Sequence, residues 1–227
     1  MGKFLRFIGI LFMGLTSAVI LLSGVGTTCV ALDATQYEGM EAIAKFQWLY
    51  ILYVLAFVAF GIMGVRATIS LVRGKANAYR DSIIVLVLSI IVGGIHMATS
   101  RSLRATGSSM PLDFIVYITI FTLVIFLIFG LPKVKQLVGF EEGGNNNGKT
   151  AAGGMTAIVS GMLFLSVQMW AGPTHILDGV NYADAFHMKM MVSGGLLIIF
   201  GLGLLTYATI ANTKVSKTAA QESQISI

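Results

Sequence analysis

Six long apolar runs are the feature that most constrains what this chain can fold into. A helix needs about 20 apolar residues to cross roughly 30 Å of hydrocarbon, and backbone polar groups inside lipid must pair within the helix. The runs cover residues 7–31, 47–72, 82–100, 113–132, 152–171 and 190–211. The sequence therefore predicts an all-α membrane protein, a bundle of six transmembrane helices.

The composition agrees with this reading and leaves no room for a soluble domain. Hydrophobic residues make up 56% of the chain and charged residues 11%, whereas soluble proteins carry about 25% charged residues. Residues 1–212 are expected to form one transmembrane domain, and the polar residues 213–227 a disordered cytoplasmic tail. The first run is longer than the usual apolar core of a signal peptide, so residues 1–31 are predicted to remain as a span, with cleavage as the alternative.

The basic residues predict the orientation, because cytoplasmic loops of membrane proteins carry an excess of Lys and Arg. With the N-terminus inside, the inner segments hold Lys3, Arg6, Arg66, Arg73, Lys75, Arg80, Lys133, Lys135, Lys149, Lys214 and Lys217. The outer segments hold only Lys45, Arg101, Arg104 and Lys189. Both termini are therefore predicted to be cytoplasmic, with the plasma (inner) membrane as the expected location. The net charge of +5 follows from this bias, and no basic patch with interleaved aromatics indicates a nucleic-acid partner.

Histidine, cysteine and methionine gather near the predicted outer boundary. The candidate metal or haem ligands are His96, His175, His187, Cys29, Met97, Met188 and Asp184. Sulfur ligands with imidazole favour copper, and histidine with carboxylate suits zinc. His96 and His187 lie on different predicted helices at similar depth, as axial ligation of a haem requires. The alternative, which the irregular spacing favours, is that these are interface and packing residues.

Arg101 and Arg104 lie on the side of the membrane that usually lacks basic residues. A guanidinium group suits carboxylate and phosphate, so the two arginines are a candidate anion-binding patch. The alternative is that they pair with Asp113, Asp33 or lipid phosphate. Asp113 is also expected to cap the fourth helix, because a carboxylate there accepts bonds from free backbone amides.

One nucleotide-binding pattern is judged to be a chance match. Gly143, Gly148, Lys149 and Thr150 satisfy the spacing of a phosphate-binding loop. That loop works where a strand feeds a glycine turn that opens a helix. Here the pattern lies in a short loop that opens onto a membrane helix, so no nucleotide site is predicted.

The sequence contains no recognisable catalytic arrangement and no acidic residue at mid-membrane, where ion pumps commonly place one. Three kinds of function remain. The first is a structural or accessory membrane subunit that contacts the lipid bilayer and another subunit or a second copy. The second is a protein that binds copper, zinc or haem at the outer face. The third is a channel or carrier for a small neutral or anionic solute.

Overall fold

The computed structural model describes residues 2–104, 109, 111–140, 147–171 and 175–225. Within these ranges six helices are long and apolar enough to cross a membrane, which confirms the predicted number of helices of this kind. The candidate spans are Phe4–Leu32, Glu41–Arg73, Ala78–Leu103, Leu112–Phe129, Gly148–Met169 and His187–Ala211. The polar fifth run, which contains several glycines, is one of them.

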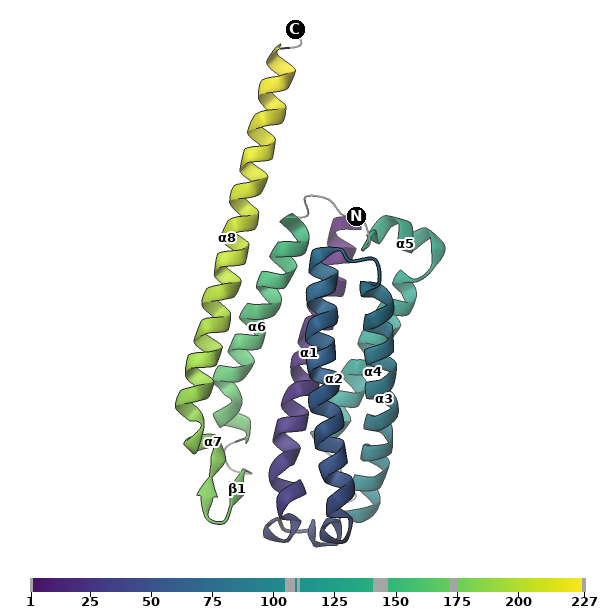
Figure 1. Ribbon diagram of the computed structural model, residues 1–227, viewed down its shortest axis with the longest axis vertical. Coiled ribbons are helices and arrows are strands. Elements are labelled where there is room, and N and C mark those ends of the chain that lie inside the picture. Colours follow the sequence, from purple (N-terminus) through teal and green to yellow (C-terminus); the bar gives the residue numbers. More distant parts are fainter. Residues whose placement is uncertain (1, 105–108, 110, 141–146, 172–174, 226–227) are drawn as a thin grey trace.

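Four long helices form an antiparallel bundle (Figure 1). They are α1 (Gly2–Leu32), α2 (Gln47–Arg73), α3 (Ala78–Leu103) and α4 (Leu112–Phe129). Helix α1 is central, because it packs against α2, α4 and α6. Both chain ends lie at one end of the molecule, which we call the terminal end; the opposite end is the loop end.

Short elements connect the spans at the two ends. At the loop end, η1 (Ala34–Gln36) and η2 (Glu41–Phe46) follow α1. At the terminal end, α2 stops at Gly74 and α5 (Pro132–Val138) stops at Gly139, with φ values of 65° and 52°. Glycine adopts this left-handed conformation without a Cβ clash, which is why both helices end there.

The last two spans form a hairpin beside the bundle. It consists of α6 (Asn147–Ala171) and α8 (His187–Ile225), joined by β1 (Ile176–Leu177), β2 (Val180–Asn181) and α7 (Tyr182–Ala185). The two strands pair antiparallel around Asp178 and Gly179, both with positive φ. Helix α6 lies between α1 and α8, so it attaches the hairpin to the bundle (Figure 1).

Helix α8 differs from the predicted disordered tail, because its backbone remains helical to Ile225. No proline or glycine follows Gly203, and half of the residues at 212–225 are alanine, lysine, glutamine or glutamate. These four residue types have high helix propensity and no helix breaker interrupts the segment, so α8 continues past its last apolar turn. In Figure 1 the end of α8 projects beyond every other element.

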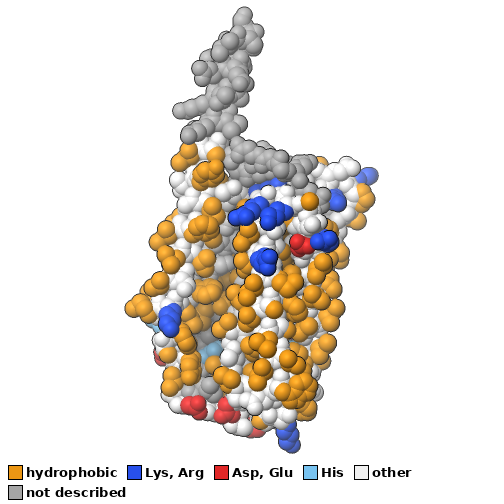
Figure 2. Space-filling model, in the orientation of Figure 1, with side chains coloured by type: hydrophobic (Ala, Val, Ile, Leu, Met, Phe, Trp, Pro, Cys, Tyr) orange, Lys and Arg blue, Asp and Glu red, His pale blue; other side chains and the backbone are white. Residues whose placement is uncertain are grey.

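The interior of the bundle contains two separate apolar clusters. The terminal-end cluster includes Ile10, Met13, Leu71, Leu86, Phe126, Phe129 and Phe140. The loop-end cluster includes Ile20, Ile43, Tyr50, Tyr53, Phe57, Leu112, Ile115 and Val116. On the face shown in Figure 2, hydrophobic side chains also cover the length of the helices, while Lys and Arg side chains gather towards the terminal end. An apolar outer surface between charged ends is what a bilayer requires.

Candidate functional site

His96 lies inside the bundle, where three aromatic rings of α2 surround its imidazole. The side chain is 2% exposed. Its ring stacks on Tyr53 with centroids 4.2 Å apart, meets the edge of Tyr50 at 5.1 Å and lies 5.9 Å from Phe57. Its Nδ1 atom has no hydrogen-bond partner. The sequence placed His96 at the membrane boundary, whereas α3 continues to Leu103 and carries the imidazole into the interior.

Polar side chains on α3 and α2 continue from His96 towards the loop end. The hydroxyls of Tyr50 and Ser100 lie 2.8 Å apart, and those of Tyr53 and Thr99 lie 3.2 Å apart. Arg104 follows at the end of α3, where burial lowers the pKa of its guanidinium from the ordinary value. Buried tyrosine and serine hydroxyls therefore satisfy one another, as the low dielectric of an interior requires.

The two arginines predicted as an anion-binding patch occupy different surroundings. Arg101 is exposed, and its Nη2 lies 3.2 Å from Oδ2 of Asp113. Asp113 also accepts a hydrogen bond from Ser109. It lies in the first turn of α4, but its side chain does not cap that helix, which begins after Pro111. Arg101 thus has an internal carboxylate partner, as the alternative interpretation expected.

His175 and Cys29 lie at the loop end of α1. A Cβ atom placed on Gly26 would lie 3.6 Å from Nε2 of His175, so this imidazole lies beside α1. The Cys29 thiol is partly buried beside Tyr37. Burial and this thiol raise the pKa of Tyr37 to about 12.

Hydrogen bonds between the η1 turn and the β-hairpin join the bundle to the α6–α8 hairpin; we call this set the loop-end clasp. Tyr37 donates from its hydroxyl to the carbonyl of Ile176 at 2.8 Å. Gln36 donates from Nε2 to Oδ1 of Asp178 and accepts from the Asp178 backbone amide, each at 2.8 Å. Asp33 accepts from Thr35, and these bonds hold the pKa of its carboxyl below the ordinary value.

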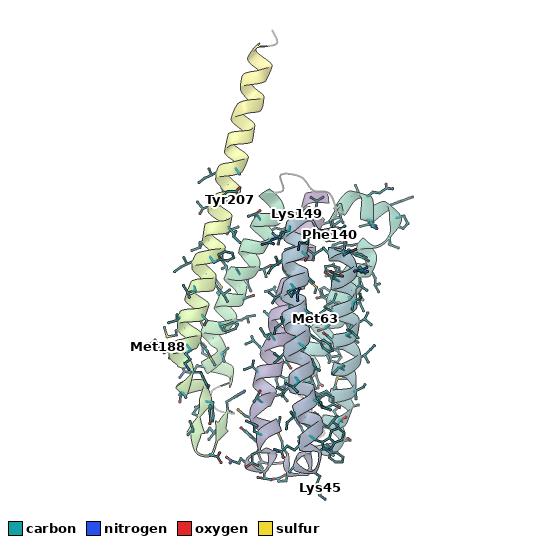
Figure 3. The ribbon with its side chains drawn as sticks, viewed as in Figure 1. Lys45, Met63, Phe140, Lys149, Met188 and Tyr207 are labelled. Atoms are coloured by element: carbon teal, nitrogen blue, oxygen red, sulfur yellow. The ribbon has the colours of Figure 1, made fainter. Side chains whose placement is uncertain are left out.

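The remaining predicted ligands lie elsewhere. His187 begins α8, and the neighbouring Met188 points away from the bundle (Figure 3). Asp184 accepts a hydrogen bond from Nε2 of Gln168 at 2.5 Å. Met97 packs against the loop-end cluster. The described contacts therefore give these residues separate partners on different elements.

The predicted metal and haem ligands remain a prediction. Over the described ranges, no group of three or more His, Cys, Asp or Glu side chains could hold a metal ion. His96 lies on α3, which packs against α2 and α4, whereas His187 lies on α8, which packs against α6. The two imidazoles proposed to bracket a haem thus belong to helices that are not packing neighbours.

The residues of the nucleotide-binding pattern lie at the start of α6. Gly143 lies outside the described residues, and Gly148, Lys149 and Thr150 form part of the first helical turns. Lys149 is buried, with Nζ 3.4 Å from the carbonyl oxygen of Phe140 (Figure 3). Nearby, Arg6 is buried and donates from Nε to the carbonyl of Val138 at 2.5 Å.

A layer of hydroxyl groups between the two apolar clusters was missed by the sequence analysis. Thr16 of α1 and Thr122 of α4 form a hydrogen bond of 2.7 Å. Ser89 of α3 is also buried, and its Oγ has no partner. Serine and threonine are common in membrane helices, so they carried no signal one by one. The seven-residue spacing of Ser82, Ser89 and His96 puts three polar side chains on one face of α3, and this pattern could have marked that face as interior.

Comparisons with known proteins add no relative. No family model matches this chain, and no curated protein or solved structure matches it. Any function must therefore be argued from the geometry.

Proposed function

We propose that this chain is an accessory subunit of a membrane complex and that α8 binds another subunit. The observation that carries the proposal is that α8 is held along one side only. Within the described chain, its main packing partner is α6. Apart from a short contact with α7, the described residues leave the other directions around this helix to lipid or to a further helix.

The seam between α6 and α8 is built from glycine pairs. A Cβ atom on Gly201 would lie 2.5 Å from the carbonyl oxygen of Gly154, and one on Gly194 would lie 2.8 Å from that of Gly161. Small residues let membrane helices approach closely, where dispersion forces and weak Cα–H···O contacts stabilise them. Helix α8 is therefore firmly attached on this side.

The opposite side of α8 is apolar and has two uncovered glycines. Gly195 and Gly203 have no atom within 4 Å of a Cβ placed on them. Exposed apolar residues flank them, including Leu196, Ile199 and Ile210. A second close approach of a membrane helix is sterically open here, with the same residue types as in the α6 seam.

The extension of α8 favours a different protein over a second copy as the occupant. Residues 212–225 continue the helix about 21 Å past the last apolar turn, at 1.5 Å per residue. The extension carries Lys214 and Lys217 with Glu222 as its one acidic residue. A parallel second copy would bring equal charges together, whereas a partner with acidic residues would attract them.

The same proposal includes the orientation. The terminal end carries most of the lysines and arginines, so we place it, with both termini, on the cytoplasmic side of the plasma membrane. The partner would then meet the α8 extension in the cytoplasm.

Photo-crosslinking in native membranes tests the proposal. A photoreactive residue at Ile199, 68% exposed on α8, is compared with one at Leu55, 60% exposed on α2. We expect a discrete protein adduct from Ile199 and only lipid adducts from Leu55. Removal of residues 212–227 should weaken the Ile199 adduct. Lipid adducts alone at both positions, or an Ile199 adduct of twice the mass of the chain, would overturn the proposal.

A further inference from the structure

The hydroxyl layer inside the α1–α4 bundle suggests a second activity, independent of α8. Its members are Thr16, Ser89, Thr119 and Thr122, all buried. They lie between the two apolar clusters, each near the middle of its helix: one on α1, one on α3 and two on α4. Buried polar atoms normally have a hydrogen-bond partner, so a layer that leaves one open requires a physical account.

The register of the helices brings these hydroxyls to one level. A Cβ atom on Gly93 of α3 would lie 3.0 Å from Val116 of α4. The helices are antiparallel, so one turn further towards the terminal end Ser89 is level with Thr119. Thr119 and Thr122 share one face of α4, because residues three apart are neighbours on a helix. The Thr16–Thr122 hydrogen bond extends the layer to α1.

Within this layer, Ser89 is the residue whose hydroxyl is left without a hydrogen-bond partner. Its side chain is 3% exposed, and its Oγ has no partner. By contrast Ser82, on the same face of α3, donates to the carbonyl of Ala78 at 2.8 Å. Thr119 donates to the carbonyl of Ile115 and keeps its acceptor lone pairs. A small molecule beside Ser89 would therefore meet both donors and acceptors.

An apolar barrier closes each side of the layer. Towards the loop end, a Cβ atom placed on Gly93 would lie 3.5 Å from the Phe57 ring and 3.0 Å from Val116, so these side chains pack closely against α3. Towards the terminal end, the rings of Phe126 and Phe140 stack with centroids 5.9 Å apart, and Phe129 lies 6.0 Å from Phe140. Apolar constrictions of this kind gate membrane pathways by excluding water until they widen.

We propose that the hydroxyl layer is an occluded binding site for a small uncharged hydrogen-bonding solute, which crosses the membrane through the α1–α4 bundle. The side chains of the layer indicate which class of solute it would bind. The four side chains of the layer are hydroxyls, which both donate and accept hydrogen bonds. None is charged, and an ion at this depth would lack the compensating charge that it needs.

Osmotic measurements on proteoliposomes of the full chain test this, with formamide and water as the two probes. Vesicles with the wild-type protein should respond faster than protein-free vesicles to at least one probe; a response to water alone identifies water as the solute. Ser89→Val should slow the response about fivefold, the effect of one lost neutral hydrogen bond. Thr206→Val, at an exposed position of α8, is the matched control and should change nothing.

A second variant keeps the test decisive if Ser89→Val fails to fold. Val116→Ala removes two methyl groups from the loop-end barrier and should speed the response. Three results would overturn the proposal: wild-type rates equal to those of protein-free vesicles, rates that neither folded variant changes, or potassium flux that accompanies the solute.

Discussion

At the scale of single residues, buried polar groups distinguish this chain from a plain apolar bundle. His96 is the clearest case, because an imidazole is enclosed by Tyr50, Tyr53 and Phe57 with Nδ1 unpaired. An unsatisfied buried nitrogen destabilises a fold by about 1–3 kcal/mol. If His96 has only a packing role, its ring stabilises the fold and its unpaired nitrogen destabilises it.

His96→Phe separates packing from ligand binding. The phenyl ring keeps the stack on Tyr53 and removes the unpaired nitrogen, so the free energy of unfolding should rise by up to about 1–3 kcal/mol. Thermal unfolding of the detergent-purified variant measures this. A marked loss of stability would contradict the packing role and indicate a ligand on Nδ1. A metal assay on the wild-type protein would then be the next step.

Tyr37 gives the loop-end clasp a defined pH dependence. The pKa of its phenol is raised from 10 to about 12, so the folded state favours the neutral form. The stabilisation is complete below pH 10 and is lost as the pH rises towards 12. Below pH 10 the wild type should exceed Tyr37→Phe in unfolding free energy by about 1 kcal/mol, the worth of one neutral hydrogen bond.

The measurement is the difference in unfolding temperature between wild type and Tyr37→Phe at a series of pH values. Taking the difference cancels the titration of lysines, which the two proteins share. The gap should close between pH 10 and 12. A gap that stays constant over that interval would show that the Tyr37 hydroxyl does not titrate as described.

At the scale of elements, the α6–α8 hairpin depends on backbone approach at two glycine pairs. Gly201→Ala would push a methyl group against the carbonyl of Gly154, and backbone cannot move aside cheaply. We expect a loss of about 1–3 kcal/mol, as for overpacked interiors. Gly203→Ala, on the uncovered side of the same helix, should stay within about 0.5 kcal/mol of the wild type. Thermal unfolding of the two variants measures the difference. Equal losses of stability would contradict the close packing of α6 and α8 at Gly201.

The elements themselves were predictable from the sequence, but their partners were not. Length and hydropathy are local properties, so six spans could be identified one by one. The pairing of Gly154 with Gly201 depends on helix register, which no local pattern encodes. Similarly, His96 was conspicuous as a rare polar residue, yet its aromatic surroundings come from α2, 39 to 46 positions away in the chain. The hydroxyl layer was missed because each serine and threonine is unremarkable alone.

At the scale of the whole molecule, the two proposed activities belong to different parts. The α1–α4 bundle holds the hydroxyl layer, and the edge helix α8 offers the surface for a partner. Polar contacts connect these parts at both ends. At the loop end they are the hydrogen bonds of the clasp, and at the terminal end Lys149, in the first turn of α6, contacts the carbonyl of Phe140, which follows α5. Both proposals require that the six helices cross a membrane with the two termini on one side.

Labelling of single cysteines in intact cells tests that requirement most directly. In a Cys29→Ser background, cysteine is introduced at Lys45, at the loop end (Figure 3), or at Lys133, in α5 at the terminal end. A membrane-impermeant thiol reagent should label Lys45→Cys in intact cells, and Lys133→Cys only after the membrane is opened. Labelling of both positions in intact cells would contradict the six-span account, and the reverse pattern would contradict the orientation.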